Sequence, residues 1–221
     1  PDDFKDYDMQ ASPISARSQG VPVVIGSGKM GYVYEMNATS GKLVWKTPVG
    51  AHNGHDNDSL HALEHRSTLK APFTIAPGPL GGVLTDLAVA PGSVYVETLD
   101  VPLTYTSLNL RAARPATPSA TGEVEALSLA TGKVEWDKRF PHLPLGAVTV
   151  SNDLVLTTLY NGVLIGLNRD SGALVYRRRL PTSTNSPIAV AGNTVIVPAG
   201  GPLTGRRGGG GHPQVVAYRV P

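Results

Sequence analysis

The sequence predicts an all-β fold, a β-propeller built from four-stranded antiparallel blades. One pattern, a strand followed by a polar turn and a second strand, occurs three times, at residues 31–45, 122–136 and 162–176. In each copy two glycines stand ten residues apart, and an aromatic residue follows the second glycine by four. Repeats of about 40 residues with four short strands are typical of propeller blades. The three aromatic residues are Trp45, Trp136 and Tyr176.

The first copy shows the pattern clearly. Tyr32, Tyr34 and Met36 alternate with smaller or polar residues, as expected for a half-buried strand. A polar turn follows at residues 37–41, where Gly41 can take a positive φ at no steric cost. The alternation then resumes, which predicts a second strand paired with the first.

Composition excludes several classes of protein. With 221 residues the chain can bury one substantial core, and a net charge of +2 with 16% charged residues gives no case for a nucleic-acid partner. No apolar run approaches the roughly 18 residues that a membrane-spanning helix needs. Because there are no cysteines, disulfides, thiolate metal sites and a cysteine nucleophile are excluded.

We expect one propeller domain over residues 1–221, with two further strands before each repeat. The first strand of each blade is expected at residues 11–16, 83–89, 146–150 and 187–191. The fourth blade lacks an outer strand, which would leave unpaired backbone at an edge. We therefore expect the C-terminal half of a seven- or eight-bladed propeller, whose remaining half comes from the same precursor or another chain. A self-closed four-bladed propeller is the alternative. The expected blades cover about residues 10–48, 83–140, 144–180 and 186–220.

Three long segments interrupt the repeats, at residues 50–82, 100–121 and 200–212. In a meandering blade these connections, and the segment before the first strand, lie on one face of the disc. The opposite face has only short turns. Since binding and catalytic residues concentrate in long loops on a rigid scaffold, the long-loop face is the expected functional face.

The run at residues 21–50, VPVVIGSGKMGYVYEMNATSGKLVWKTPVG, resembles the quinoprotein alcohol dehydrogenase-like propellers, as does DYDMQASPI before it. That family includes enzymes that use pyrroloquinoline quinone (PQQ) with Ca²⁺, and cofactor-free relatives such as the BamB-type assembly lipoprotein. The resemblance implies a dehydrogenase that oxidises an alcohol or sugar. The alternative that it leaves open is a non-enzymatic scaffold or binding module with no cofactor and a protein partner. Either reading implies an extracytoplasmic location.

Two stretches carry the resemblance to the enzymes. PDDFKDYD resembles the Pro-His-Asp-x-x-Asp-Tyr-Asp segment of PQQ dehydrogenases; Asp6 and Asp8 match it, while Asp2 stands at the histidine position. Lys29, in GSGKMGYVY, falls where a lysine or arginine contacts the quinone oxygens. A cation there stabilises the negative charge that develops on the reduced quinone. The resemblance thus implies cofactor contacts by Lys29, Asp6 and Asp8, although the adjacent cysteines of many such enzymes are missing. An ordinary hairpin-tip lysine is the alternative for Lys29.

The densest polar cluster lies within the first long segment, at residues 52–65. Imidazole and carboxylate groups suit Zn²⁺ or another transition ion, and the two aspartates alone suit Ca²⁺. The spacing fits neither the H-E-x-x-H motif nor the EF-hand loop, so a polar loop whose side chains cap turns is the alternative. The candidate metal ligands are His52, His55, Asp56 and Asp58.

Overall fold

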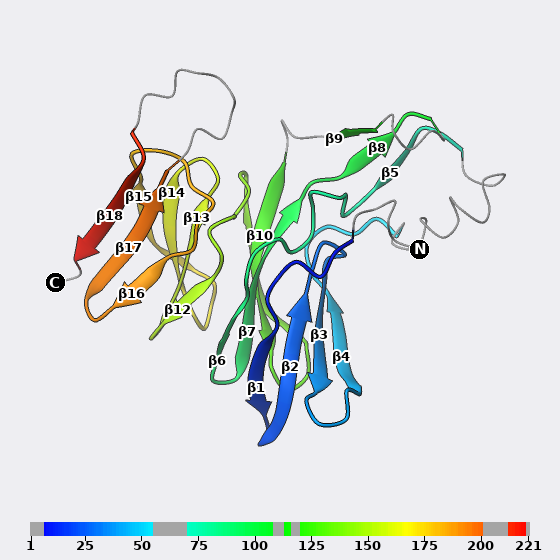
Figure 1. Ribbon diagram of the computed structural model, residues 1–221, viewed down its shortest axis with the longest axis horizontal. Coiled ribbons are helices and arrows are strands. Elements are labelled where there is room, and N and C mark those ends of the chain that lie inside the picture. Colours follow the sequence, from blue (N-terminus) through cyan, green and yellow to red (C-terminus); the bar gives the residue numbers. More distant parts are fainter. Residues whose placement is uncertain (1–6, 55–69, 108–112, 116–119, 201–211, 220–221) are drawn as a thin grey trace.

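The computed structural model describes residues 7–54, 70–107, 113–115, 120–200 and 212–219. All regular elements in these ranges are β-strands, so the predicted all-β class is confirmed. None of these residues forms a helix long and apolar enough to cross a membrane. Three four-stranded antiparallel sheets and a three-stranded one follow each other along the chain, as in propeller blades (Figure 1).

We call these sheets blades one to four. Blade one contains β1 (Ile14–Ser18), β2 (Val21–Ser27), β3 (Tyr32–Asn37) and β4 (Leu43–Pro48). Blade two contains β6 (Ala88–Ala90), β7 (Ser93–Asp100), β10 (Thr121–Ser128) and β11 (Val134–Phe140). Blade three contains β12 (Thr149–Ser151), β13 (Leu154–Leu159), β14 (Val163–Asn168) and β15 (Leu174–Arg179). Blade four contains β16 (Ala189–Ala191), β17 (Thr194–Ala199) and β18 (Gln214–Arg219).

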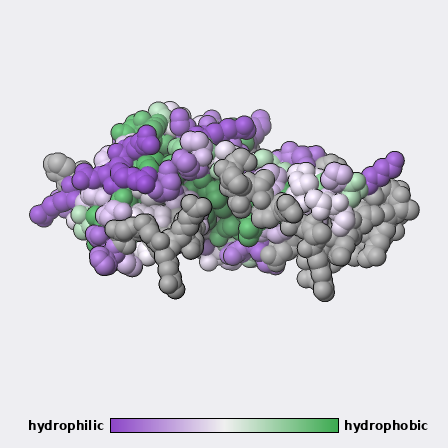
Figure 2. Space-filling model, turned by 90° about the horizontal axis from the view of Figure 1, so that it is seen from above, coloured by the Kyte–Doolittle hydropathy of each residue, from purple (hydrophilic) through white to green (hydrophobic). Residues whose placement is uncertain are grey.

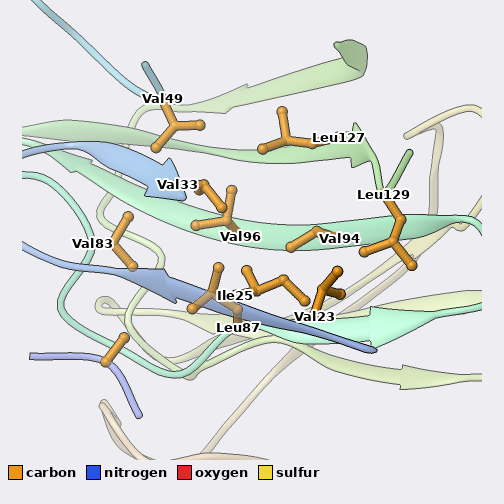
Figure 3. Close-up of a cluster of buried hydrophobic side chains, with 11 residues drawn as sticks. Val23, Ile25, Val33, Val49, Val83, Leu87, Val94, Val96, Leu127 and Leu129 are labelled. Carbon is orange, nitrogen blue, oxygen red and sulfur yellow. The ribbon is translucent and has the colours of Figure 1, made fainter. Parts of the chain in front are cut away.

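The hydrophobic core lies between neighbouring blades rather than within one. In Figure 3, Val23, Ile25 and Val33 of blade one pack against Val94 and Val96 of blade two. Similar clusters join blade two to blade three and blade three to blade four. Blades two and three direct alternate side chains to the blades on either side, which explains the period-two pattern in the sequence. The first strands of blades one, two and three lie next to each other and form the inner side of the stack.

An indole ring joins the outer edges of neighbouring blades. Gly132, in the turn before β11, would place a Cβ atom 2.6 Å from the ring of Trp45, so only a glycine fits beneath the ring. Trp45 Nε1 donates a hydrogen bond of 3.1 Å to the carbonyl of Leu129 in the same turn. The contact recurs one blade later, where Trp136 covers Gly172. The shared spacing of glycine and aromatic residue in the repeats therefore fixes blade one against blade two and blade two against blade three.

The innermost strands are shorter than the sequence predicts. The expected strand at 83–89 is observed only as β6, and the one at 146–150 only as β12. The residues before them bind neighbouring blades instead: Val83 N donates to the carbonyl of Gly28, and Ala147 N donates to the carboxylate of Glu97. Backbone groups that pair between blades cannot also form the ladder within a blade.

Two of the segments expected as loops form a fifth sheet. β5 (Phe73–Ile75), from the first long segment, pairs with β8 (Leu103–Tyr105) of the second, and β8 pairs with β9 (Ala113–Pro115). Alternate residues of β5 and β8 are apolar and bury each other, with the rings of Phe73 and Tyr105 stacked at 5.1 Å. In Figure 1 the small sheet lies above blade one, at the end opposite the turn between β3 and β4. The two segments therefore do lie on one face, but as a sheet.

The indole contact predicts a contrast between two equivalent aromatic residues. Trp136 is 8% exposed and covers Gly172, whereas Tyr176, at the same repeat position in blade three, is 39% exposed. Trp136→Ala should lower the free energy of unfolding by about 3–5 kcal/mol, because it leaves a cavity over the glycine. Tyr176→Ala should cost less than about 1 kcal/mol, as at most surface positions. Urea unfolding followed by circular dichroism measures both, and equal losses would contradict the assigned role of the indole.

Candidate functional site

The hairpin between β2 and β3 carries the lysine that the sequence singled out. Lys29 is only 8% exposed, and its Nζ lies 3.1 Å from Oδ2 of Asp8. Its backbone N–H also donates a 3.0 Å hydrogen bond to the carbonyl of Asp8. A Cβ atom on Gly28 would collide with that same carbonyl, so the glycine allows the N-terminal segment to lie directly on the hairpin. Lys29 is therefore a covered, ion-paired residue rather than an exposed hairpin-tip lysine.

Blade two holds the other side of this hairpin. Gly82 packs so closely that a Cβ atom there would collide with the carbonyl of Lys29, and Val83 N donates to the carbonyl of Gly28 at 3.0 Å. Within the tip, Gly31 N also donates to Gly28 O. The hairpin is thus clamped between the N-terminal segment and the next blade, which fixes the position of the Lys29 ammonium group.

The N-terminal segment is tied to the small sheet as well. The Tyr7 hydroxyl donates a 2.6 Å hydrogen bond to the carbonyl of Pro77, which follows β5 in the chain. Of the two aspartates predicted for the cofactor, Asp8 is thereby placed beside Lys29, with its side chain 64% exposed. Asp6 lies outside the described residues. Figure 2 shows the molecule from this end: apolar residues gather near its middle and at its upper left, and hydrophilic residues lie mainly along the left side and the upper edge.

His52 is the one predicted metal ligand that the structure describes. Its Nε2 lies 2.8 Å from the carbonyl of Gly31 and its ring meets that of Tyr32 edge-on at 4.9 Å. Because a carbonyl only accepts, Nε2 is the donor, and a metal would have to bind through Nδ1. The other predicted ligands, His55, Asp56 and Asp58, lie outside the described residues. In the ranges that are described, no group of three or more His, Cys, Asp or Glu residues could hold a metal ion.

The side chain of Asn53 ties the chain that leaves blade one to the small sheet. Its side-chain amide donates to the carbonyl of Thr74 at 2.8 Å, and its Oδ1 accepts the backbone N–H of Ala76 at 3.0 Å. The amide thus extends the hydrogen bonding of the small sheet by one more position. These two hydrogen bonds to backbone groups agree with the alternative interpretation of the polar cluster, in which its side chains cap turns.

A buried carboxyl group that the sequence did not single out lies between blades two and three. Glu97 accepts hydrogen bonds from the hydroxyls of Thr85 and Thr157, both at 2.6 Å, and from the backbone N–H of Ala147 at 2.8 Å. Burial raises its pKa to about 7, although the three hydrogen bonds oppose the rise. Through these hydrogen bonds Glu97 connects three chain segments and holds blade three against blade two.

A second buried carboxyl group supports the corner after β4. Glu125 accepts the backbone N–H of Gly50 at 2.7 Å, and burial raises its pKa to about 8. Glu123, two residues earlier, lies 2.9 Å from Nε of Arg139, and its pKa is raised to about 7 by burial and by the charge of Asp100. Because Glu123 and Glu125 interact, the two carboxyl groups titrate together rather than singly. The hydrogen bond from Gly50 to Glu125 fixes where the first long segment leaves the blade.

Comparisons with known proteins show what this chain is similar to. Residues 120–214 match a family model described as "Outer membrane protein assembly factor BamB". The chain is similar to the quinohemoprotein alcohol dehydrogenase ADHIIG from Pseudomonas putida HK5, with 14% identity and a TM-score of 0.65 over 85% of this chain. It is also similar to the quinohemoprotein alcohol dehydrogenase from Comamonas testosteroni, with 16% identity and a TM-score of 0.65 over 85% of this chain. A europium-containing methanol dehydrogenase gives 15% identity and a TM-score of 0.70 over 90% of this chain.

The predicted resemblance is confirmed by the family model over residues 120–214 and by the propeller fold that the chain shares with the solved structures. At these identities the similarity to solved structures shows the fold alone. The matched regions make up 34%, 33% and 41% of the three solved chains, so this chain spans between a third and two fifths of the length of these proteins. A search of curated proteins finds no significant match.

The raised pKa of Glu97 predicts a dependence of stability on pH. Its pKa is about 7 in the folded chain against an ordinary value of 4.5, so the folded state binds the proton more tightly. The contribution of Glu97 to stability is therefore full below pH about 4.5 and is lost as the pH rises through about 7. The loss from this group is at most about 3 kcal/mol. Glu97→Gln should reduce the fall in the free energy of unfolding between pH 5 and 8.

Glu135→Gln provides the control, because it removes a carboxyl group that is exposed on β11. That variant should keep the pH dependence of the unchanged protein. Glu123 and Glu125 leave a residual slope in both variants. Identical slopes for Glu97→Gln and the unchanged protein in urea titrations would show that the proton on Glu97 does not contribute.

Proposed function

We propose that this chain is part of a PQQ-dependent dehydrogenase propeller that oxidises an alcohol or a sugar. The observation that carries the proposal is Lys29, a largely buried ammonium group held by Asp8 on the face where the long segments meet. The quinohemoprotein alcohol dehydrogenases that share the fold support it. Bound PQQ would accept the two electrons of the oxidation.

The roles of the residues follow from charge and burial. An ammonium group that is shielded from water stabilises negative charge on nearby quinone oxygens more strongly than one in solvent. Asp8 would orient that ammonium group, and the clamped hairpin would keep it in place without reorganisation. Asp6 is assigned to the same surroundings on the resemblance alone. We keep His52, His55, Asp56 and Asp58 as a proposed metal site, with Ca²⁺ as the ion that the resemblance implies for PQQ.

The remaining parts of such a site would come from further blades. Because the chain spans roughly a third of the dehydrogenases that it resembles, we propose that the rest of the propeller supplies further contacts to the cofactor and the substrate. The location that we propose is extracytoplasmic, as the resemblance to exported propellers implies.

A second candidate function is that of an assembly scaffold without cofactor. The observation in its favour is the family model described as an outer membrane protein assembly factor, which matches residues 120–214. In that case the long-loop face would bind a protein partner, and the ion pair of Lys29 would serve only to fix the N-terminal segment.

Titration with PQQ distinguishes the two candidates. The full natural polypeptide that carries these residues is titrated with PQQ, with and without Ca²⁺, and binding is followed by protein fluorescence. Saturable binding is expected, and Lys29→Ala should weaken it by about 10- to 100-fold, the value of a hydrogen bond to a charged group. Lys42→Ala is the control, because it removes the same charge from the β3–β4 turn at the opposite end of the blade.

Oxidation of alcohols is measured in parallel with an artificial electron-accepting dye. Dye reduction that depends on both PQQ and Lys29 would support the dehydrogenase. Absence of binding at high micromolar PQQ would exclude it and would favour the scaffold. Equal losses in Lys29→Ala and Lys42→Ala would remove Lys29 from the cofactor site.

A further inference from the structure

The outer strand of blade three, β15, presents a long exposed edge. All six of its residues are exposed, whereas the outer strands of blades one and two, β4 and β11, each include residues that are partly or fully buried. In the described part of the chain β15 pairs only with β14, so its other edge has no strand partner. Unpaired backbone at a sheet edge is a template to which an extended peptide can add as a further strand.

The hydrogen bonds of β15 show which of its backbone groups point outward. Leu180 N donates to the carbonyl of Gly162 at 2.8 Å, so the backbone of Leu180 faces β14. Because hydrogen bonding alternates along an antiparallel pair, Arg178 also bonds to β14, whereas Arg177 and Arg179 direct their N–H and C=O groups away from the sheet. The free edge of β15 therefore consists of the backbone of two arginines.

The side chains of these two arginines lie on one face of the blade. Arg177 pairs with Ile165 and Arg179 pairs with Val163. Both partners belong to the apolar cluster between blades two and three. Because paired residues point to the same side of a sheet, both guanidinium groups are directed toward blade two, on residues about 7 Å apart along the strand. Arg178, between them in the chain, points to the opposite face.

The positive charge of β15 is not compensated. In the ranges that the structure describes, no carboxylate forms an ion pair with any of its three arginines. By contrast, β11 carries two acidic and two basic residues, and its Arg139 lies 2.9 Å from Glu123. The one charge on β4, Lys46, lies over the ring of Tyr32. Like charges on consecutive residues repel each other, and an anionic partner relieves that repulsion.

We infer that β15 binds an extended acidic segment of a partner protein, which adds to blade three as a fifth antiparallel strand. Its acidic side chains lie opposite Arg177 and Arg179. Alternate residues of an extended segment repeat at the same interval of about 7 Å, and arginine binds carboxylates through two parallel hydrogen bonds. The inference goes beyond the proposed function, because it requires no cofactor and concerns the outer edge of the blades rather than the long-loop face.

The beginning of β15 adds an apolar part to this edge. Leu174, Val175 and Tyr176 are 43%, 56% and 39% exposed. The partner segment is therefore expected to carry apolar residues next to its acidic ones. A second copy of the chain does not fit through its own β15, because each strand would bring three positive charges to the same edge.

The test uses a fluorescein-labelled peptide in which glutamate alternates with threonine and apolar residues follow. Binding to the full natural polypeptide is measured by fluorescence anisotropy at about 0.15 M salt, where the screening length is about 8 Å. Saturable binding is expected, and Arg177→Ala and Arg179→Ala should each weaken it by about 2- to 5-fold. Arg178→Ala, the matched control, should weaken it by less than about 2-fold, because that guanidinium lies on the opposite face, 4.7 Å from the ring of Tyr218.

Modified peptides test the strand pairing on the unchanged protein, so no variant has to fold. N-methylation of the glutamates removes the N–H groups that face β15 and should weaken binding by about 5-fold or more. N-methylation of the threonines, whose N–H groups point away, is the control. A peptide of the same composition with contiguous glutamates should also bind more weakly.

Three results would overturn the inference. One is equal binding of the two N-methylated peptides, or of the alternating and contiguous peptides, because the edge would then attract any anion. Another is an equal loss of binding in Arg177→Ala and Arg178→Ala. The third is the absence of saturation at high micromolar peptide. No PQQ is present in these measurements, so they are independent of the outcome of the cofactor titration.

Discussion

The contact between an indole ring and a bare glycine decides how the blades of this protein stack. A single sheet has two apolar faces and cannot bury both by itself, so each blade depends on its neighbours for stability. Apolar side chains alone would allow neighbouring sheets to slide. The indole of Trp45 prevents this, because it fits only where Gly132 leaves space and where the carbonyl of Leu129 accepts its N–H. Apolar packing provides the free energy of the interface, and the indole contact fixes the position of one blade relative to the next.

The stacking of blades in turn fixes the position of the candidate site. Lys29 lies on a hairpin of blade one, but Gly82 at the start of blade two and Asp8 of the N-terminal segment set its environment. Buried carboxyl groups hold the surrounding connections, with Glu97 between blades two and three and Glu125 at the corner after β4. The ammonium group therefore keeps its place through contacts from three separate parts of the chain.

The sequence predicted what depends on local spacing and missed what depends on contacts between distant segments. Glycine and aromatic spacing predicted the repeat and the all-β class. The carboxyl group of Glu97 was missed because its partners, Thr85 and Thr157, are far from it in the chain; the available signal was a charge within the apolar strand SVYVETLD. The small sheet was missed because β5 and β8 are only three residues long and their pairing joins two segments that are far apart in the sequence.

The small sheet makes two distant insertions into one unit. Thr74 and Thr104 face each other across β5 and β8 with their hydroxyls 2.9 Å apart, and Phe73 stacks on Tyr105 from the same two strands. Loops on a rigid scaffold usually vary in length independently of each other. Here a deletion in either insertion would strip the other of its pairing partner and expose its apolar side chains. In related proteins the two insertions should therefore be gained, lost and exchanged together, as an inherited pair.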